Sequence, residues 1–119
     1  MSKILVTGGT GLVGAHLLYY LVKNGHSPTA IKRKKSNVKN VEKIFNYYSD
    51  NTKNLFDQII WQECDILDFL NLEEIIQNTT HIYHCAALIS FNNSLKNKML
   101  EVNTVGTSNI IDLALKYNI

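Results

Sequence analysis

Glycines near the N-terminus have the spacing of a loop that binds phosphate groups. Residues 7–14 read TGGTGLVG, in which Gly9, Gly11 and Gly14 fit the pattern G-x-G-x-x-G. Such glycines permit a tight turn, let the backbone approach a pyrophosphate and allow a helix to pack closely on a strand. The N–H groups at the start of that helix then face the phosphates. The alternative is a glycine-rich turn without a ligand. A Walker loop is excluded, because Ala15-His16 replace the required Lys and Ser or Thr.

The chain on either side of the glycines supplies the strand and the helix that this chemistry needs. Residues 3–7 (KILVT) form a short apolar, β-branched run, which predicts a buried strand. Residues 12–23 have apolar side chains at helical spacing and end before Asn24-Gly25, a pair typical of a helix C-terminus. The glycines therefore lie in the context that a dinucleotide-binding motif requires.

Strand and helix patterns alternate along the rest of the chain, which predicts parallel βαβ units. Three more strands are expected at residues 29–32, 56–63 and 81–86; Pro28 stands at the start of the first of them, where no ladder hydrogen bond is lost. Further helices are expected from Val41 to about Asp50-Asn51, over 69–77 and over 96–117.

Length limits residues 1–119 to one domain at most, expected to be the N-terminal part of a dinucleotide-binding domain, and composition excludes several classes of protein. Apolar residues make up 45% of the sequence, enough for a hydrophobic core, and no apolar run approaches the length of a membrane span. No secretory signal is present and two cysteines suit a reduced protein, so a cytoplasmic location is expected. The four histidines, Cys64 and Cys85 lack the spacing of a metal site.

Charge is distributed unevenly along the sequence. Residues 1–41 contain seven basic side chains and no acidic one, whereas residues 42–119 contain five basic and ten acidic ones. The N-terminal part therefore carries +7 and the remainder −5, within a net charge of +2. This asymmetry predicts an anionic partner for the N-terminal part, and charge alone leaves a nucleotide, a nucleic acid and a membrane surface open.

Four stretches together resemble the extended short-chain dehydrogenases/reductases. TGGTGLVG is similar to that family's T-G-x-x-G-x-x-G loop, read with Gly8 as its first glycine. Cys64-Asp65-Ile66 resembles the acidic–aliphatic pair after the third strand. His84-Cys85-Ala86-Ala87 resembles the H-x-A-A segment, and residues 102–107 (VNTVGT) resemble the V-N-x-x-G-T start of a long helix. Residues 88–91 (LISF) look closest to the branch of dihydroflavonol reductases, 3β-hydroxysteroid dehydrogenases and nucleotide-sugar epimerases.

The resemblance implies an NAD(P)-binding Rossmann fold, an α/β fold with a truncated parallel sheet of strand order 3-2-1-4 and helices on both faces. It places Asp65 and Ile66 against adenine, and the H-x-A-A segment along the cofactor. Asn103 would link the last helix to neighbouring backbone, or would be a simple polar residue at a helix start. The residues predicted to bind the cofactor are Gly8, Gly9, Thr10, Gly11, Leu12, Val13, Gly14, Arg33, Lys34, Asp65, Ile66, Cys85, Ala86, Ala87 and Asn103.

The sequence favours NADP over NAD as the cofactor. NAD-binding Rossmann domains hold the ribose 2′-hydroxyl with an acidic residue about 20 positions after the glycines. Here the second expected strand ends in residues 31–36 (IKRKKS) with no acid in reach, and Arg33 stands where reductases of the family often hold the 2′-phosphate. An arginine suits a phosphate, whereas a carboxylate would repel it. NAD is the alternative cofactor, and a solvated basic loop is the alternative role for these residues.

The family's catalytic residues are not expected within residues 1–119. A Y-x-x-x-K pair with an upstream Ser or Thr performs its acid/base chemistry. The first match here, Tyr19 and Lys23, lies on the helix after the glycines, far too early in the fold, so Tyr19 is interpreted as a packing residue. Ser90 and Ser94 also precede the usual place of the catalytic serine. Catalytic and substrate-binding parts are expected beyond Ile119, and an uncovered fourth strand would favour self-association, hence a homo-oligomer.

Three functions of different kinds are compatible with these observations. The favoured one is the NAD(P)(H)-binding segment of an oxidoreductase or nucleotide-sugar epimerase/dehydratase, whose substrate is a small alcohol or ketone. A stand-alone, non-catalytic NAD(P)-binding sensor is the alternative. Nucleic-acid binding through Lys32–Lys35 is disfavoured, because no groove-reading motif accompanies the basic residues.

Overall fold

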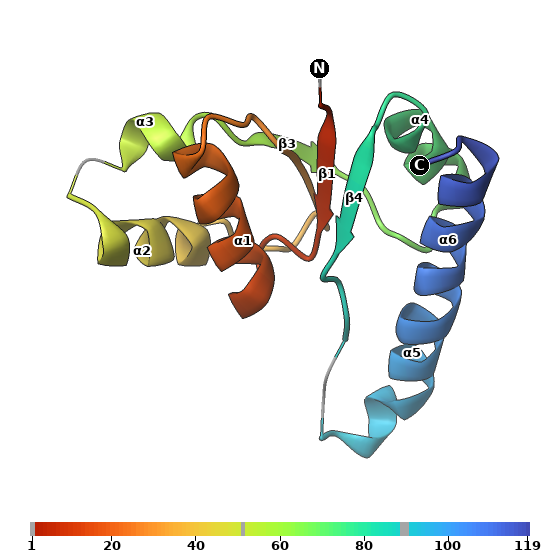
Figure 1. Ribbon diagram of the computed structural model, residues 1–119. Coiled ribbons are helices and arrows are strands. Elements are labelled where there is room, and N and C mark those ends of the chain that lie inside the picture. The colour runs from red at the N-terminus through yellow and green to blue at the C-terminus, as the bar shows by residue number, and fades with distance from the viewer. Residues whose placement is uncertain (1, 51, 89–90) are drawn as a thin grey trace.

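Four parallel strands form one sheet in the order β3-β2-β1-β4, as predicted. The computed structural model describes residues 2–50, 52–88 and 91–119, so the expectations that rest on Asn51, Ile89 and Ser90 lie outside the described residues. The strands are β1 (Ile4–Thr7), β2 (Thr29–Lys32), β3 (Ile60–Glu63) and β4 (His81–His84). β1 pairs with β2 on one side and with β4 on the other, which places it inside the sheet (Figure 1).

Helices cover both faces of the sheet. On one face lie α1 (Leu12–Lys23), α2 (Lys39–Tyr48) and the single turn α3 (Lys53–Phe56). On the other lie α4 (Phe69–Ile76) and α6 (Thr107–Lys116), with α5 (Lys96–Glu101) extending the line of α6 away from the sheet (Figure 1). A 3-10 turn, Asn93–Leu95, precedes α5, and a π-helical turn, Val102–Gly106, joins α5 to α6. The predicted Rossmann architecture is confirmed.

The two faces have separate hydrophobic cores, because successive side chains of a strand point to opposite sides of the sheet. Val6 packs on the side of α1 and α2, in a cluster that includes Phe45. Leu5 packs on the other side, with Leu72 of α4 and Leu113 of α6. Every residue of β1 is buried, which explains why the sequence there is a continuous apolar run rather than an alternating one.

The third and fourth strands are shorter than the sequence predicted. The strand expected at 56–63 begins only at Ile60, because the preceding residues form α3 and the Phe56 ring packs edge-on against Phe45, with 5.8 Å between centroids. Packing on the core therefore outweighs the β-propensity of this run. The strand expected at 81–86 ends at His84, because its partner β1 ends at Thr7.

The helix expected over 96–117 is interrupted by the π turn and ends at Lys116. Gly106 of this turn is buried so closely against the segment after β3 that a Cβ would lie 2.4 Å from Ile66 Cδ1. A π turn shifts the face of a helix locally and is frequent at functional sites. The apolar residues of this region follow the regular helical period, so the sequence does not predict the π turn.

Candidate functional site

The turn after β1 is built on Gly8. Its φ of +69° is in the left-handed region, which glycine adopts without a steric penalty. A Cβ here would also lie 2.5 Å from the Ala86 amide nitrogen and 2.6 Å from the Cys85 carbonyl oxygen. Gly9 lies outside the left-handed region and faces Leu18 of the core. Gly8 therefore makes both the turn and the close approach to β4.

Gly11 and Gly14 bring the start of α1 against this turn. The Gly11 N–H donates to the Gly8 carbonyl at 3.1 Å, and a Cβ on Gly14 would lie only 2.0 Å from that same carbonyl oxygen. Among the described hydrogen bonds, none uses the N–H groups of Leu12, Val13 or Gly14, and the first turn of α1 contains no acidic residue. These N–H groups and the positive end of the helix are therefore available to an anion.

A cavity of about 200 Å³ opens beside this helix start, at the carboxyl ends of the strands. The strand order reverses at β1 and β4, and α/β proteins bind ligands at such a point. Many of the residues predicted to bind the cofactor line this cavity: Gly8, Thr10, Gly11, Arg33, Asp65, Ile66, Cys85, Ala86 and Ala87. Ile31, Lys32, Ser36, Cys64, Leu88 and Val102 line it as well, although they were not among the residues predicted to bind the cofactor.

The other predicted residues lie beside the cavity rather than in its wall. They are Gly9, Leu12, Val13, Gly14, Lys34 and Asn103. Gly9 and Gly14 are buried beneath the turn, whereas the Leu12 and Val13 side chains are exposed at the start of α1. Lys34 lines a neighbouring hollow, and Asn103 supports the cavity wall from behind.

Basic residues after β2 border the cavity on the side away from β4. The Ser36 N–H donates to the Arg33 carbonyl at 3.0 Å and closes a turn there. A second, more open hollow of about 710 Å³ adjoins this turn and is lined by residues 33–36 together with Glu63 and Asp65. Among the described residues the exposed Arg33 makes no ion pair, so its guanidinium is available to an anionic ligand.

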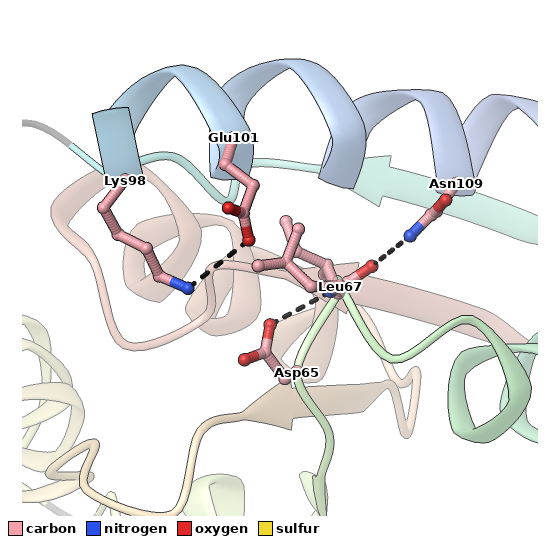
Figure 2. A network of polar contacts seen from close by, with 6 residues as sticks. Asp65, Leu67, Lys98, Glu101 and Asn109 are labelled. Atoms are coloured by element: carbon pink, nitrogen blue, oxygen red, sulfur yellow. Dashed lines mark hydrogen bonds and ion pairs between the residues drawn. The ribbon is translucent and has the colours of Figure 1, made fainter. Parts of the chain in front are cut away.

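The turn after β3 is fixed from two sides. The Asp65 carboxylate accepts a hydrogen bond from the Leu67 N–H at 3.0 Å, which closes a turn typical of aspartate. Asn109 of α6 donates to the Ile66 carbonyl at 2.8 Å. Figure 2 shows Asp65 and Asn109 on either side of Leu67 in this turn. The family resemblance indicated Asp65 and Ile66, but nothing in the sequence indicated that Asn109 holds the same turn.

Asn103 of the π turn holds the segment after β4. Its side-chain oxygen accepts from the Leu88 N–H at 2.9 Å, and its side-chain nitrogen donates to the Leu88 carbonyl at 3.0 Å. The predicted link between the last helix and neighbouring backbone is confirmed. Asn103 thereby fixes the wall that Ala86, Ala87 and Leu88 give to the cavity.

A half-buried histidine connects β1, β4 and α6. His84 Nδ1 lies 2.6 Å from Thr7 Oγ1, and His84 Nε2 lies 3.0 Å from Thr107 Oγ1. The Thr7 hydroxyl also accepts a hydrogen bond from the Ala86 N–H at 3.1 Å. The family motifs contain His84 and Thr107, but sequence reasoning gave no sign that both meet at Thr7.

The two cysteine thiols in the cavity wall are expected to react at different rates. Cys64 is 5% exposed, and burial, together with Asp68 and Asp65, raises its pKa to about 11. Cys85 is partly exposed, and burial alone raises its pKa. Since the thiolate is the reactive form, iodoacetamide at about pH 8 should alkylate Cys85 first, as measured by mass spectrometry of the peptides. The variant Cys85→Ser should be labelled slowly, and faster labelling of Cys64 than of Cys85 would contradict this expectation.

In the early tyrosine–lysine pair, Tyr19 belongs to the core and Lys23 is exposed. Tyr19 is 6% exposed, its ring stacks on Tyr48 with 5.0 Å between centroids, and Lys23 Nζ lies 5.9 Å from the Tyr19 centroid. The interpretation of Tyr19 as a packing residue with an exposed lysine is confirmed.

The family model described as GDP-mannose 4,6 dehydratase matches residues 5–119. The chain belongs to this family. The resemblance to the extended short-chain dehydrogenases/reductases is thereby confirmed, and the match belongs to their epimerases and dehydratases.

Relatives and solved structures of this kind are longer than the chain. UDP-N-acetyl-alpha-D-glucosaminuronate decarboxylase of Bacillus cytotoxicus is 29% identical over 97% of this chain and 33% of its own length. The UDP-Glc/GlcNAc 4-epimerase of Campylobacter jejuni is 27% identical, with a TM-score of 0.75 over 99% of this chain and 35% of that one. A UDP-glucose-4-epimerase of Stenotrophomonas maltophila with bound NAD is 22% identical, with a TM-score of 0.79 over 100% and 35%. The chain spans about a third of these proteins.

Two kinds of feature are absent from the part of the chain that the structure describes. None of its helices combines the length and hydropathy of a membrane span. Within residues 2–50, 52–88 and 91–119, no group of three or more His, Cys, Asp or Glu side chains is placed to hold a metal ion.

Proposed function

We propose that residues 1–119 bind NADP(H), or alternatively NAD(H), as the cofactor segment of an oxidoreductase, epimerase or dehydratase whose substrate is a nucleotide sugar or another small alcohol or ketone. In this reaction class a hydride passes between the nicotinamide and a carbinol carbon of the substrate. The names of the relatives, which include UDP-sugar decarboxylases and 4-epimerases, support this substrate class. The catalytic Tyr/Lys pair and the substrate site are proposed to lie outside residues 1–119, so this segment alone should bind cofactor without turnover.

One observation carries the proposal: backbone atoms, without side chains, form the surface around the turn at Gly8 and the start of α1. A Cβ at Gly8 or Gly14 would overlap backbone atoms, at 2.5 Å and 2.0 Å, so side chains are kept away from the approach to the helix. The unused N–H groups of the first turn supply donors for a pyrophosphate, and the cavity continues along the ends of β3 and β4. The N–H donors at the start of α1 and the adjoining cavity fit a dinucleotide.

NADP is proposed over NAD on the basis of the residues after β2. No carboxylate follows this strand within residues 33–41, and Arg33 lines both the cavity and the adjoining hollow. A guanidinium binds a phosphate through paired hydrogen bonds, which favours the 2′-phosphate of NADP at this end of the site.

The Arg33→Ala variant tests this preference in the complete protein. We expect its affinity for NADPH to fall by about tenfold or more, because a charge-assisted contact is lost, while the affinity for NADH stays within about twofold. Isothermal titration calorimetry with both cofactors measures this difference. Lys43→Ala, which removes an equal charge from the exposed side of α2, is the control and should bind both cofactors normally. Unchanged NADPH affinity in Arg33→Ala would remove the argument for NADP.

A stand-alone NAD(P) sensor is the second candidate, and one observation separates it from the first. If the native reading frame continues past Ile119 into a Ser or Thr and a Y-x-x-x-K pair, the segment is part of an enzyme. If the frame lacks those residues, binding without turnover is the whole function. The observation in favour of the sensor is that, among the described residues, Tyr19 is packed in the core and the exposed Lys23 does not line the cavity.

A cellular location and a state of assembly are proposed as well. A cytoplasmic location is supported by two cysteines that are free rather than paired. Self-association is proposed for residues 1–119 taken alone, because β4 forms one edge of the described sheet and leaves Tyr83 half exposed.

A further inference from the structure

Thr7, His84 and Thr107 are joined by hydrogen bonds next to the glycine turn. Thr7 is the last residue of β1, and the next residue, Gly8, makes the turn. Within the β1–β4 pair, Thr7 is opposite His84, and Thr107 begins α6. One imidazole therefore joins β1 and β4, whose ends form the turn and one wall of the site, to the start of α6.

The hydrogen bonds that join Thr7, His84 and Thr107 indicate a neutral imidazole on His84. The Thr7 oxygen already accepts from the Ala86 N–H, and its own proton can then go to an unprotonated His84 Nδ1, while Nε2–H donates to Thr107. An imidazolium would donate from both nitrogens. The Thr7 oxygen would then accept twice, and none of the described hydrogen bonds would give its proton an acceptor.

The Thr7 hydroxyl affects the site through its hydrogen bond with the Ala86 N–H. The Ala86 N–H that it fixes belongs to the peptide that packs on Gly8, where a Cβ would lie 2.5 Å from the Ala86 nitrogen. A shift of Thr7 or Ala86 therefore moves both the turn and the cavity wall.

We propose that His84 is a positioning residue of the dinucleotide site: as a neutral imidazole it fixes the Thr7 hydroxyl against Ala86, and its protonation weakens cofactor binding. This inference rests on the proposed function. His84 does not line the cavity, so it acts through Thr7 and Ala86 rather than by touching the ligand.

The surroundings of His84 give the direction of the pH effect. β1 brings no titratable group to it, α6 carries Asp112 and Lys116, and Cys85 is the neighbour on its own segment. No described hydrogen bond or ion pair joins these groups to His84; burial lowers the pKa of His84 below its ordinary 6.5. The neutral arrangement is therefore complete above pH 6.5 and is lost as the pH falls through the lowered pKa.

A matched pair of threonine variants in the complete protein tests the positioning role. Thr80 makes the corresponding contacts at the other end of the same strands, since its hydroxyl accepts from the Lys3 N–H at 2.7 Å. We expect Thr7→Val to lower NAD⁺ affinity by about tenfold and Thr7→Ser to restore it, because serine keeps the hydroxyl. Thr80→Val should destabilise the β1–β4 pair as well, yet bind NAD⁺ as the wild type does. Equal losses in Thr7→Val and Thr80→Val would overturn the proposal.

The pH dependence of NAD⁺ affinity tests whether protonation of His84 weakens binding. This test does not require the Thr7→Val variant to fold. NAD⁺ is the probe, because its pyrophosphate stays ionised across the range, unlike the 2′-phosphate of NADP. Wild-type affinity should fall below pH 6.5, by at most about tenfold per pH unit, whereas His84→Gln, which can donate and accept without titrating, should show a flat profile. Identical profiles would overturn the proposal. If the wild type binds neither NAD⁺ nor NADP⁺ at any pH, the proposed function itself fails.

Discussion

Replacing Gly14 by alanine is expected to abolish NAD(P) binding by the complete protein. The added Cβ would lie 2.0 Å from the Gly8 carbonyl oxygen and 2.7 Å from the Gly8 carbonyl carbon. Both are backbone atoms, so the overlap cannot be relieved by a rotamer change, and α1 must move away from the turn. Its unpaired N–H groups then lose their positions, and each lost contact to a phosphate is worth about 1.5–3 kcal/mol. Calorimetric titration with NADP⁺ and NAD⁺ should detect no binding in Gly14→Ala.

Gly25→Ala is the matched control for this experiment. Gly25 has a φ of +87° but no atom within 4 Å of an added Cβ, so the substitution costs backbone strain without a clash. We expect a loss of about 1–2 kcal/mol in stability and an unchanged affinity for the cofactor. Normal binding by Gly14→Ala would show that the close contact of α1 with the turn is not needed for the site.

Replacing Phe45 by alanine is expected to give the largest loss of stability. This side chain is 0% exposed and meets the ring of Tyr19 edge-on at 5.2 Å and that of Phe56 at 5.8 Å, so it joins α2 to α1 and α3. Removal of a buried phenylalanine costs about 3–5 kcal/mol, a large part of the stability of a small domain. Urea unfolding followed by circular dichroism measures the change.

Tyr47→Ala provides the comparison on the same helix. Tyr47 is 85% exposed, and its removal should change the free energy of unfolding by no more than about 0.5 kcal/mol. If the two variants unfolded at the same urea concentration, α2 would not be packed on the sheet as described.

The parts of the fold that the sequence predicted are those with a strong local pattern. The run KILVT is apolar without alternation because β1 is covered on both faces, and the glycines directly after it fix the turn. The order of strands followed from the family resemblance and not from any local pattern. The family resemblance also predicted Asp65, Ile66 and residues 85–87, because each is part of a recognisable motif next to a strand end.

The parts that could not be predicted depend on contacts between distant residues. His84 meets Thr7 from 77 positions away, and Asn109 reaches Ile66 from 43 positions away. Neither pair has a spacing or a residue type that would distinguish it in the sequence. The π turn and α3 were missed for a related reason, since tertiary packing against Ile66 and Phe45 sets the local conformation there.

The pairing of β1 with β4 also constrains the order in which the protein can form during synthesis. The glycine turn is made first, but the Ala86 N–H that the Thr7 hydroxyl accepts comes 79 residues later. At about 5–20 residues per second, the ribosome takes roughly 4–16 s to supply it. During that interval Gly8 has no peptide to pack against, and β1 can pair only with β2. The turn at Gly8 therefore gains its contact with the Ala86 peptide only after β4 has left the ribosome.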